Sequence, residues 1–227
     1  MFTENTASGE APPPSDAFFD KIREKDFPCV GAKSALANDR MKVMLARDLT
    51  SAWNDLKIHD ALLDWAALDL PPDDLRSFAV IFEQPRNLTE RAFERAMWDR
   101  LQSLSDKDVW KDQPYDPSVS SDPEHPDFSL SFGGSAFFVV GLHPNASRPA
   151  RRFPNPTLVF NLHDQFERLR EKGIYTRMRE RILDRDKELA GDINPMLAVH
   201  GESSEARQYS GRIVEEDWQC PFRRRHP

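Results

Sequence analysis

The sequence has few cysteines and no long apolar run. Its two cysteines, Cys29 and Cys220, are too few for a disulfide scaffold or a closed structural zinc site, although one could serve as a thiolate ligand. No apolar run approaches the roughly 18 residues that a membrane helix requires, the best being residues 137–142. We therefore expect a soluble protein with no membrane partner.

Familiar catalytic signatures are also missing. The sequence contains no G-x-S-x-G, P-loop, G-x-G-x-x-G, H-E-x-x-H or C-x-x-C motif. Residues 1–19 have neither a basic n-region nor an apolar h-region, so we expect no secretory signal and a cytoplasmic location. A net charge of −7 lacks the basic footprint of a nucleic-acid-binding protein, so no nucleic-acid partner is expected.

The composition is that of a globular protein with an uneven charge. Hydrophobic residues make up 39% and charged residues 30%, with 15 Phe and 5 Trp, which excludes a disordered or fibrous chain. Residues 1–142 carry 15 Lys+Arg against 25 Asp+Glu, whereas residues 143–227 carry 16 against 13. The basic part is rich in arginine, which suits bidentate recognition of a carboxylate or phosphate-like group on a small ligand.

Hydrophobic periodicity predicts an α+β fold. Residues 1–14, with three consecutive prolines, are expected to be a disordered tail, and residues 15–227 a single domain. Because the expected strands do not alternate regularly with helices, we predict a small central antiparallel sheet flanked by helices. Expected helices are 15–25, 34–53, 55–68, 87–104, 163–172 and 176–189; expected strands are 77–83, 128–132, 136–142 and 157–161.

A long proline-rich loop is expected between the fourth helix and the second strand. Residues 111–127 contain four prolines and no apolar period. A loop of this length in a compact domain is more often functional than idle, so it is a candidate lid.

The densest polar cluster is HPNASRPARRF, residues 143–153. His143 would emerge at a strand end, where binding sites are commonly built, and three arginines follow it. Arg148, Arg151 and Arg152 repel one another unless an anionic group, such as a carboxylate or a pair of propionates, lies among them. The alternative is a solvated basic loop paired with acidic surface residues.

A second cluster is FNLHDQFERLR, residues 160–170. Asn161 is expected to cap the following helix, which places His163 in the first turn near the positive end of the macrodipole. This position favours the neutral imidazole that a metal ligand requires, and Asp164 or Asn161 could orient its second nitrogen. The alternative is a structural histidine.

The third cluster is GESSEARQYSGR, residues 201–212. Its content of carboxylates and guanidinium groups could bind a zwitterion and present a carboxylate to a cation, or could form an internally salt-bridged loop. The polar side chains in this cluster are Glu202, Glu205, Arg207, Gln208, Tyr209 and Arg212. Cys29 and Cys220 lie in apolar settings, where a thiol normally stays protonated and inert.

These clusters carry a resemblance to a known family. Five segments in a fixed order resemble the YqcI/YcgG family, and the resemblance covers roughly residues 15–222. The segments are FPC at 27–29, HPNASRPARRF at 143–153, LVFNLHDQFERLR at 158–170, INPMLAVHGESSEARQYSGR at 193–212 and WQCPF at 218–222. Several members of that family are haem-dependent N-oxygenases that oxidise the side-chain nitrogen of amino acids. The resemblance implies haem b with its iron as cofactor.

Carried to this chain, the resemblance makes His163 the preferred proximal ligand of the iron, with His143 and Cys29 as alternatives. A helix-borne imidazole with a fixed hydrogen-bond partner is a usual way to hold haem iron. The arginine group would hold the haem propionates or the substrate carboxylate. It comprises Arg148, Arg151 and Arg152.

The resemblance also implies roles for the third cluster and for five phenylalanines. Glu202 and Glu205 are candidate carboxylates for a cationic substrate nitrogen, and Tyr209 is a candidate hydrogen-bond donor. The haem would need an apolar slot. Its candidate lining residues are Phe137, Phe138, Phe153, Phe160 and Phe166.

The function expected from the resemblance is an N-oxygenase that acts on the side-chain amine or guanidine of an amino acid or related metabolite. Dioxygen or peroxide is the expected co-substrate, and a reductase is a candidate partner. The alternatives are a haem-binding protein without oxygenase activity and a haem-free module that binds a small anion.

Overall fold

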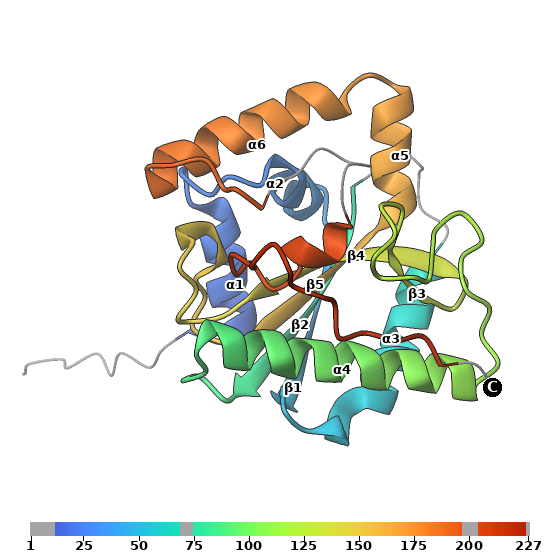
Figure 1. Cartoon of the computed structure of the whole chain (residues 1–227). Helices are drawn as coiled ribbons and strands as arrows, with labels where there is room; N and C mark the ends of the chain where they lie inside the picture. Colours follow the sequence, from blue (N-terminus) through green and yellow to red (C-terminus); the bar gives the residue numbers. More distant parts are fainter. Residues whose placement is uncertain (1–11, 69–74, 197–203, 226–227) are drawn as a thin grey trace, which may run out of the picture.

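Five strands form a mixed sheet in the computed structural model, which describes residues 12–68, 75–196 and 204–225 (Figure 1). Their order is β1-β2-β5-β4-β3. β1 and β2 pair in parallel, while the other neighbours pair antiparallel. The strands are β1 Met41–Asp48, β2 Ser77–Gln84, β3 Leu130–Phe132, β4 Ser135–Leu142 and β5 Thr157–Leu162.

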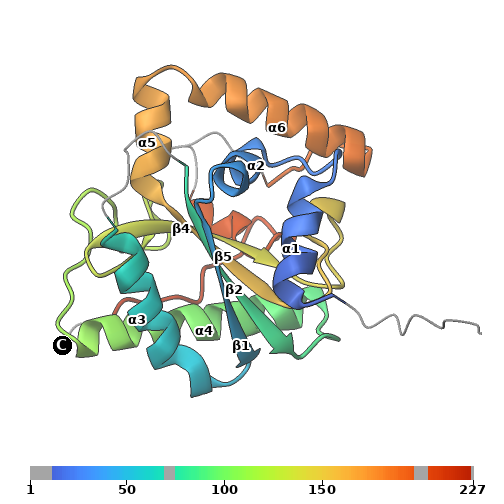
Figure 2. The same ribbon diagram turned by 180° about the vertical axis from the view of Figure 1, so that it is seen from behind.

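Helices cover both faces of the sheet. Helices α3 and α4 lie on one face and α1, α2 and α6 on the other, as the two opposite views show (Figures 1 and 2). The α-helices are α1 Pro14–Arg23, α2 Val30–Ala37, α3 Asp55–Ala66, α4 Glu90–Trp110, α5 His163–Glu171 and α6 Tyr175–Ala190. Short 3-10 helices are η1 Ala52–Asn54, η2 Pro149–Arg151 and η3 Glu205–Gln208.

Strand alternation divides the core between the two faces. Along β2, Phe78, Val80 and Phe82 belong to the larger apolar cluster under α3 and α4. Ala79 and Ile81 point the other way, into the smaller cluster that α1 covers. Successive side chains of a strand point to opposite faces, so a strand buried on both sides reads as one continuous apolar run. This is why the apolar run FAVIF, residues 78–82, is uninterrupted in the sequence.

The expected α+β class is confirmed, but one expected helix is wrong. Residues 34–53 contain the end of α2 and the whole of β1. Met, Leu and Ala are strong helix formers, yet here the pairing of β1 with β2 outweighs intrinsic propensity. Because α3 connects β1 to a parallel neighbour, the sheet is mixed rather than purely antiparallel.

The remaining expected helices and strands match observed elements, with end points that differ by one to three residues except in α4, which ends six residues beyond the expected residue 104. The expected tail falls mostly on residues 1–11, which lie outside the described residues, and α1 already begins at Pro14. Residues 111–127 contact the β3–β4 hairpin through Asp116, whose side chain accepts a hydrogen bond from the Ala136 amide at 2.9 Å. That this segment acts as a lid stays a prediction.

The β3–β4 turn depends on a glycine that contacts α3. Gly133 has φ +60°, and a Cβ atom added there would collide with Cδ2 of Leu63. We expect Gly133→Ala to lower the free energy of unfolding by about 2 kcal/mol or more, because left-handed strain and overpacking add together. Urea denaturation followed by circular dichroism measures the change.

Gly173 provides the matched control. It has φ +66°, but a Cβ atom added there would meet nothing within 4 Å, so Gly173→Ala should cost only the backbone strain, about 1 kcal/mol. Equal losses in the two variants would contradict the contact between Gly133 and α3.

Candidate functional site

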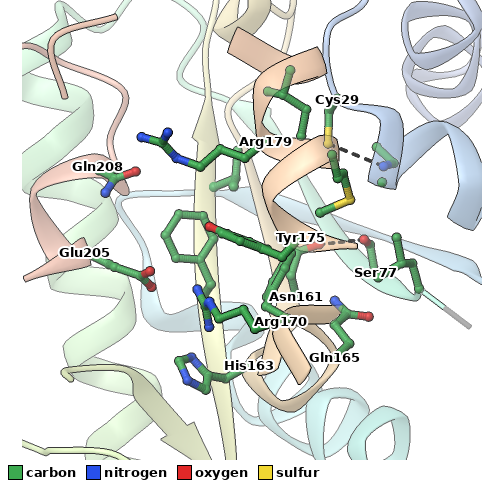
Figure 3. A pocket seen from close by; sticks show the side chains of 18 of the residues that line it. Cys29, Ser77, Asn161, His163, Gln165, Arg170, Tyr175, Arg179, Glu205 and Gln208 are labelled. Carbon is green, nitrogen blue, oxygen red and sulfur yellow. Dashed lines mark hydrogen bonds between the residues drawn. The ribbon is translucent and has the colours of Figure 1, made fainter. Parts of the chain in front are cut away.

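A cavity of about 200 Å³ lies between the sheet and helices α2, α5 and α6 (Figure 3). We call it the His163 cavity. Its apolar wall comprises Leu75, Phe138, Val140, Phe166, Met178, Ile182 and Leu183. Its polar lining comprises Cys29, Ser77, Asn161, His163, Gln165, Arg170, Tyr175, Arg179, Glu205 and Gln208. The mixture of an apolar wall and a few convergent polar groups is typical of a small-molecule site.

A second cavity of about 180 Å³ adjoins the first, and we call it the Arg151 cavity. Arg148, Arg151, Asp186 and Asn194 supply polar groups that belong to this cavity alone. The two cavities share Cys29, Ala32, Ser77, Val140, Asn161 and Ile182. The shared residues lie where the two cavities adjoin along the sheet under α6; we call this region the neck and the two cavities together the cleft.

A hydrogen-bonded polar pair lies on the floor of this neck. Ser77 of β2 is the register partner of Asn161 of β5, and its hydroxyl donates to Asn161 Oδ1 at 2.6 Å. The expected helix-capping role of Asn161 is therefore wrong: α5 has Leu162 as its N-cap, without a side-chain cap. The Asn161 side chain lines the cleft instead, because β5 continues through residue 162.

His163 is the first residue of α5, and its ring is buried at one end of the cleft (Figure 3). Its Nδ1 lies 3.3 Å from Ser129 Oγ, and its Nε2 lies 3.1 Å from Glu167 Oε1. These are the groups that orient the ring, whereas the expected partner Asp164 forms an ion pair with Arg168 at 2.7 Å. Helical spacing explains the difference, because residues four apart lie on one face.

The same face of α5 carries Arg170 into the cavity. Its guanidinium forms an ion pair with Glu167 and lies over the ring of Tyr175, 4.4 Å from the centroid. Tyr175 begins α6, and Met178, Arg179 and Ile182 follow at helical spacing along the cavity roof. These lining residues were not predicted from the sequence, although their i, i+3, i+4, i+7 spacing from residue 175 carries the signal.

A carboxylate and an amide line the side of the His163 cavity that lies opposite the sheet residues Ser77 and Asn161. Glu205 and Gln208 of η3 lie across the cavity from Ser77 and Gln165, with Arg170 and Tyr175 between them (Figure 3). Glu205 is thus placed at the cavity, as expected for a group that contacts a ligand. Glu202 lies outside the described residues.

Tyr209 does not line either cavity. Its side chain is fully buried, stacks on Trp98 with ring centroids 5.5 Å apart, and donates a hydrogen bond to the carbonyl of Phe137 at 3.2 Å. Burial raises its pKa well above the usual value, so the hydroxyl stays protonated. Its expected role as a substrate hydrogen-bond donor is not supported by this position, since it is a core residue.

His143 lies on the other face of the sheet from the cleft. Its ring stacks on Phe93 of α4 with centroids 4.3 Å apart, and it borders neither cavity. Both ring nitrogens are buried without a hydrogen-bond partner among the described residues, and burial lowers the pKa of His143 to about 4. The ring is therefore neutral at pH 7.

The β4–β5 register separates the two histidines. Leu142 pairs with Thr157 and Phe137 pairs with Leu162, so His143 and His163 follow opposite ends of the strand pair. At about 3.3 Å per residue, seven residue steps place them about 23 Å apart along the strands. The two imidazoles therefore cannot ligate one iron, and the cavity lining favours His163.

The three arginines after His143 do not converge on one point. Arg148 is buried and forms ion pairs with Asp186 and Asp192. Arg151 lines the Arg151 cavity and donates to backbone carbonyls. Arg152 is exposed, borders neither cavity, and donates to the carbonyls of its own loop. Only two of the three border the cleft, because the η2 turn aims them in different directions.

Cys29 is a lining residue with a structural role. It is the N-cap of α2, and its Sγ accepts a hydrogen bond from the Ala32 amide at 3.4 Å. Burial raises the pKa of this thiol, which favours the protonated form over a thiolate ligand.

Cys220 is buried in the core on the α4 side, and burial raises its pKa to about 12.

Two of the five expected slot phenylalanines reach the cavity. Phe138 and Phe166 line it, with their rings edge to face and centroids 6.4 Å apart. Phe137 and Phe160 are in the core under α3 and α4, and Phe153 packs against Phe18 of α1. Strand alternation sends Phe137 and Phe138 to opposite faces.

Two other kinds of site are absent from the part of the chain that the structure describes. No group of three or more His, Cys, Asp or Glu side chains among residues 12–68, 75–196 and 204–225 could hold a metal ion. No helix in these ranges is long and apolar enough to cross a membrane. The feature that the fold does present is the cleft, so the chain forms an α+β domain with a candidate small-molecule site.

Sequence comparison identifies the family. A model of the YqcI/YcgG family matches residues 18–223, so the chain belongs to that family. It is 27% identical over 207 residues to "Uncharacterized protein YcgG" of Bacillus subtilis (strain 168), covering 86% of this chain and 80% of that protein. No solved structure matches the chain.

The burial of a neutral His143 makes stability depend on pH. The unfolded chain protonates this ring near pH 6.5 and the folded chain only near pH 4, so stability falls as the pH drops through this window. His143→Phe keeps a ring against Phe93 and removes the titration. The wild type should lose about 2 to 3 kcal/mol more than this variant between pH 7 and pH 4.

Denaturant titrations of both proteins at half-unit pH steps measure the difference. A parallel decline of the two stability curves would show that the His143 ring does not titrate in this way.

Proposed function

We propose that this chain is a haem-dependent N-oxygenase that acts on the side-chain amine or guanidine of an amino acid or related metabolite. The observation that carries the proposal is one buried imidazole, His163, at the wall of a largely apolar cavity that also contains guanidinium and carboxylate groups. Family membership supports it through the resemblance described above.

The residues of the His163 cavity fit a haem group chemically. Haem would bring four iron ligands of its own, so a single protein imidazole would be enough to hold it. His163 has Ser129 at one ring nitrogen and Glu167 at the other. His163 would hold the iron through one ring nitrogen, and the contact at the other nitrogen would keep the ring orientation and tautomer. Arg170 and Arg179 are cationic groups suited to propionates.

Haem would supply the activation of dioxygen or peroxide, and the chain supplies positioning, electrostatics and exclusion of water. The apolar wall formed by Phe138, Val140 and Phe166 keeps water away from the reacting centre. His163 holds its place at the start of α5 because β5 fixes the preceding residue in the sheet.

Glu205 would hold the cationic end of the substrate. Its carboxylate lies across the cavity from the sheet floor, where an ammonium or guanidinium group can form a charge-assisted hydrogen bond (Figure 3). Gln208, one helical turn further along η3, adds a neutral donor and acceptor on the same side. The chain thereby presents a carboxylate to the nitrogen that is to be oxidised.

The first test is haem content. If His163 is the axial ligand, His163→Ala should lose most of the haem during purification while the protein stays folded. His143→Phe is the matched control and should keep its haem, because His143 lies on the opposite face of the sheet. The measurement is Soret absorbance per mole of protein, with circular dichroism as the fold check.

Full haem retention in His163→Ala with an unchanged spectrum would remove His163 from this role. A protein that binds no hemin at all would overturn the haem assignment itself.

The second test concerns the charge of the substrate. Glu205→Gln should raise KM roughly tenfold or more for cationic amines and guanidines, because a charge-assisted hydrogen bond is lost. The KM for neutral amines should stay unchanged. Glu216→Gln, at an exposed position outside both cavities, is the control. An equal loss for neutral and cationic substrates would reassign Glu205 to a structural role.

A further inference from the structure

Arg151 is a cation whose hydrogen-bond partners among the described residues are all neutral. Its guanidinium donates to the carbonyls of Gly141 at 3.1 Å, Gln208 at 3.2 Å and Tyr209 at 3.3 Å. No carboxylate oxygen of the described residues lies within ion-pair distance of it. Gly211 packs against its stem, because a Cβ there would lie 3.0 Å from Arg151 Cγ. The guanidinium is therefore held in one place by carbonyl groups rather than by a counter-ion.

The neighbouring charges do not neutralise Arg151. Asp186 also lines the Arg151 cavity, but its carboxylate is paired with Arg148. Arg148 also forms an ion pair with Asp192, so both aspartates are in contact with Arg148 and neither is in contact with Arg151. Burial lowers the pKa of Arg151 to about 10, so the group is still protonated at pH 7 while its charge is poorly solvated.

The rest of this cavity is apolar and suits a hydrocarbon chain. Side chains from α1, the loop before α2 and three strands form the wall. They include Phe18, Ile22, Phe27, Met41, Leu142 and Val159. A ligand with an anionic end and an aliphatic body matches both properties, because the anion gains a counter-charge and the chain leaves water.

We propose that the Arg151 cavity binds the carboxylate end of a ligand with an unbranched aliphatic chain, and that Arg151 is the anchor for this carboxylate. Among the three arginines after His143, the geometry assigns this role to Arg151 alone. Arg148 is already paired with two aspartates, and Arg152 lies outside the cleft.

The identification of this ligand as the substrate rests on the proposed function. On that proposal, a chain that starts at Arg151 would run past Cys29, Ser77 and Asn161, which line both cavities, into the His163 cavity. Its nitrogen-bearing end then lies on the side of His163 and Glu205. The Arg151 cavity would thus select carboxylate-bearing substrates over decarboxylated amines of the same length.

Binding of a simple probe tests the anchor without any turnover. Isothermal titration calorimetry with hexanoate and hexylammonium compares two chains of equal length and opposite charge. We expect hexanoate to bind at least about tenfold more tightly, since a charge-assisted contact forms with Arg151. Equal affinity, a preference for hexylammonium, or no hexanoate binding would overturn the proposal.

Variants locate the bound carboxylate. Arg151→Met should weaken hexanoate binding about tenfold or more, while Arg152→Met, at an exposed position outside the cleft, should leave it unchanged. Arg151 also joins β4 to η3, so the fold is checked by thermal unfolding. If Arg151→Met does not fold, Ala150→Phe fills the cavity with Arg151 in place and should abolish binding. Undiminished binding in either variant would contradict the assignment.

A second experiment asks whether Arg151 binds the carboxylate of a free ligand or a propionate of haem. Hexanoate binding should persist after the protein is loaded with hemin; its loss on loading would reassign Arg151 to a propionate and overturn the substrate site. In the loaded protein, Arg151→Met should raise KM for L-arginine but not for agmatine, which lacks the carboxylate. Hexanoate binding without any turnover would leave the Arg151 site standing and refute the oxygenase proposal.

Discussion

The antiparallel pairing of β4 with β5 is the constraint on which the arrangement of the cleft depends. Its register runs from Phe137 opposite Leu162 to Leu142 opposite Thr157. The pairing places Phe138 beside Asn161 on the cleft floor and sends Phe137 and Val139 into the core under α4. A shift by one residue would exchange these faces and move every one of these side chains to the wrong side.

The cleft combines apolar walls with charges that the protein compensates unequally. At one end, His163, Glu167 and Arg170 form a linked group along one face of α5. At the other end, Arg148 is compensated by two aspartates, whereas Arg151 donates its hydrogen bonds to carbonyl groups. Arg151 is only partly exposed, and a charge that is withdrawn from water without a counter-ion is costly, so such a group is retained where the fold holds it rigidly or a ligand completes it.

A helix or strand could be predicted from the sequence when local interactions stabilise it, and not when pairing with a distant segment does. The helix beginning at Glu90 was predictable because Thr89 caps it and its apolar residues repeat at helical spacing. The strand β1 was not, because Met41, Met44 and Leu45 also satisfy a helical pattern and only pairing with β2 decides between them. Asn161 shows the same limit, since capping residues and strand residues look alike until the end of β5 is known.

The sequence by itself determined the α+β class, most element positions, the three polar clusters and the family resemblance, because these depend on local pattern and on residue identity in order along the chain. Only the tertiary structure decided which cluster members meet. It placed His163 and Glu205 on one cavity, buried Tyr209 in the core, and put His143 on the opposite face from His163. The physical reason is that strand register and helix packing, which join residues far apart in the chain, set the direction of each side chain.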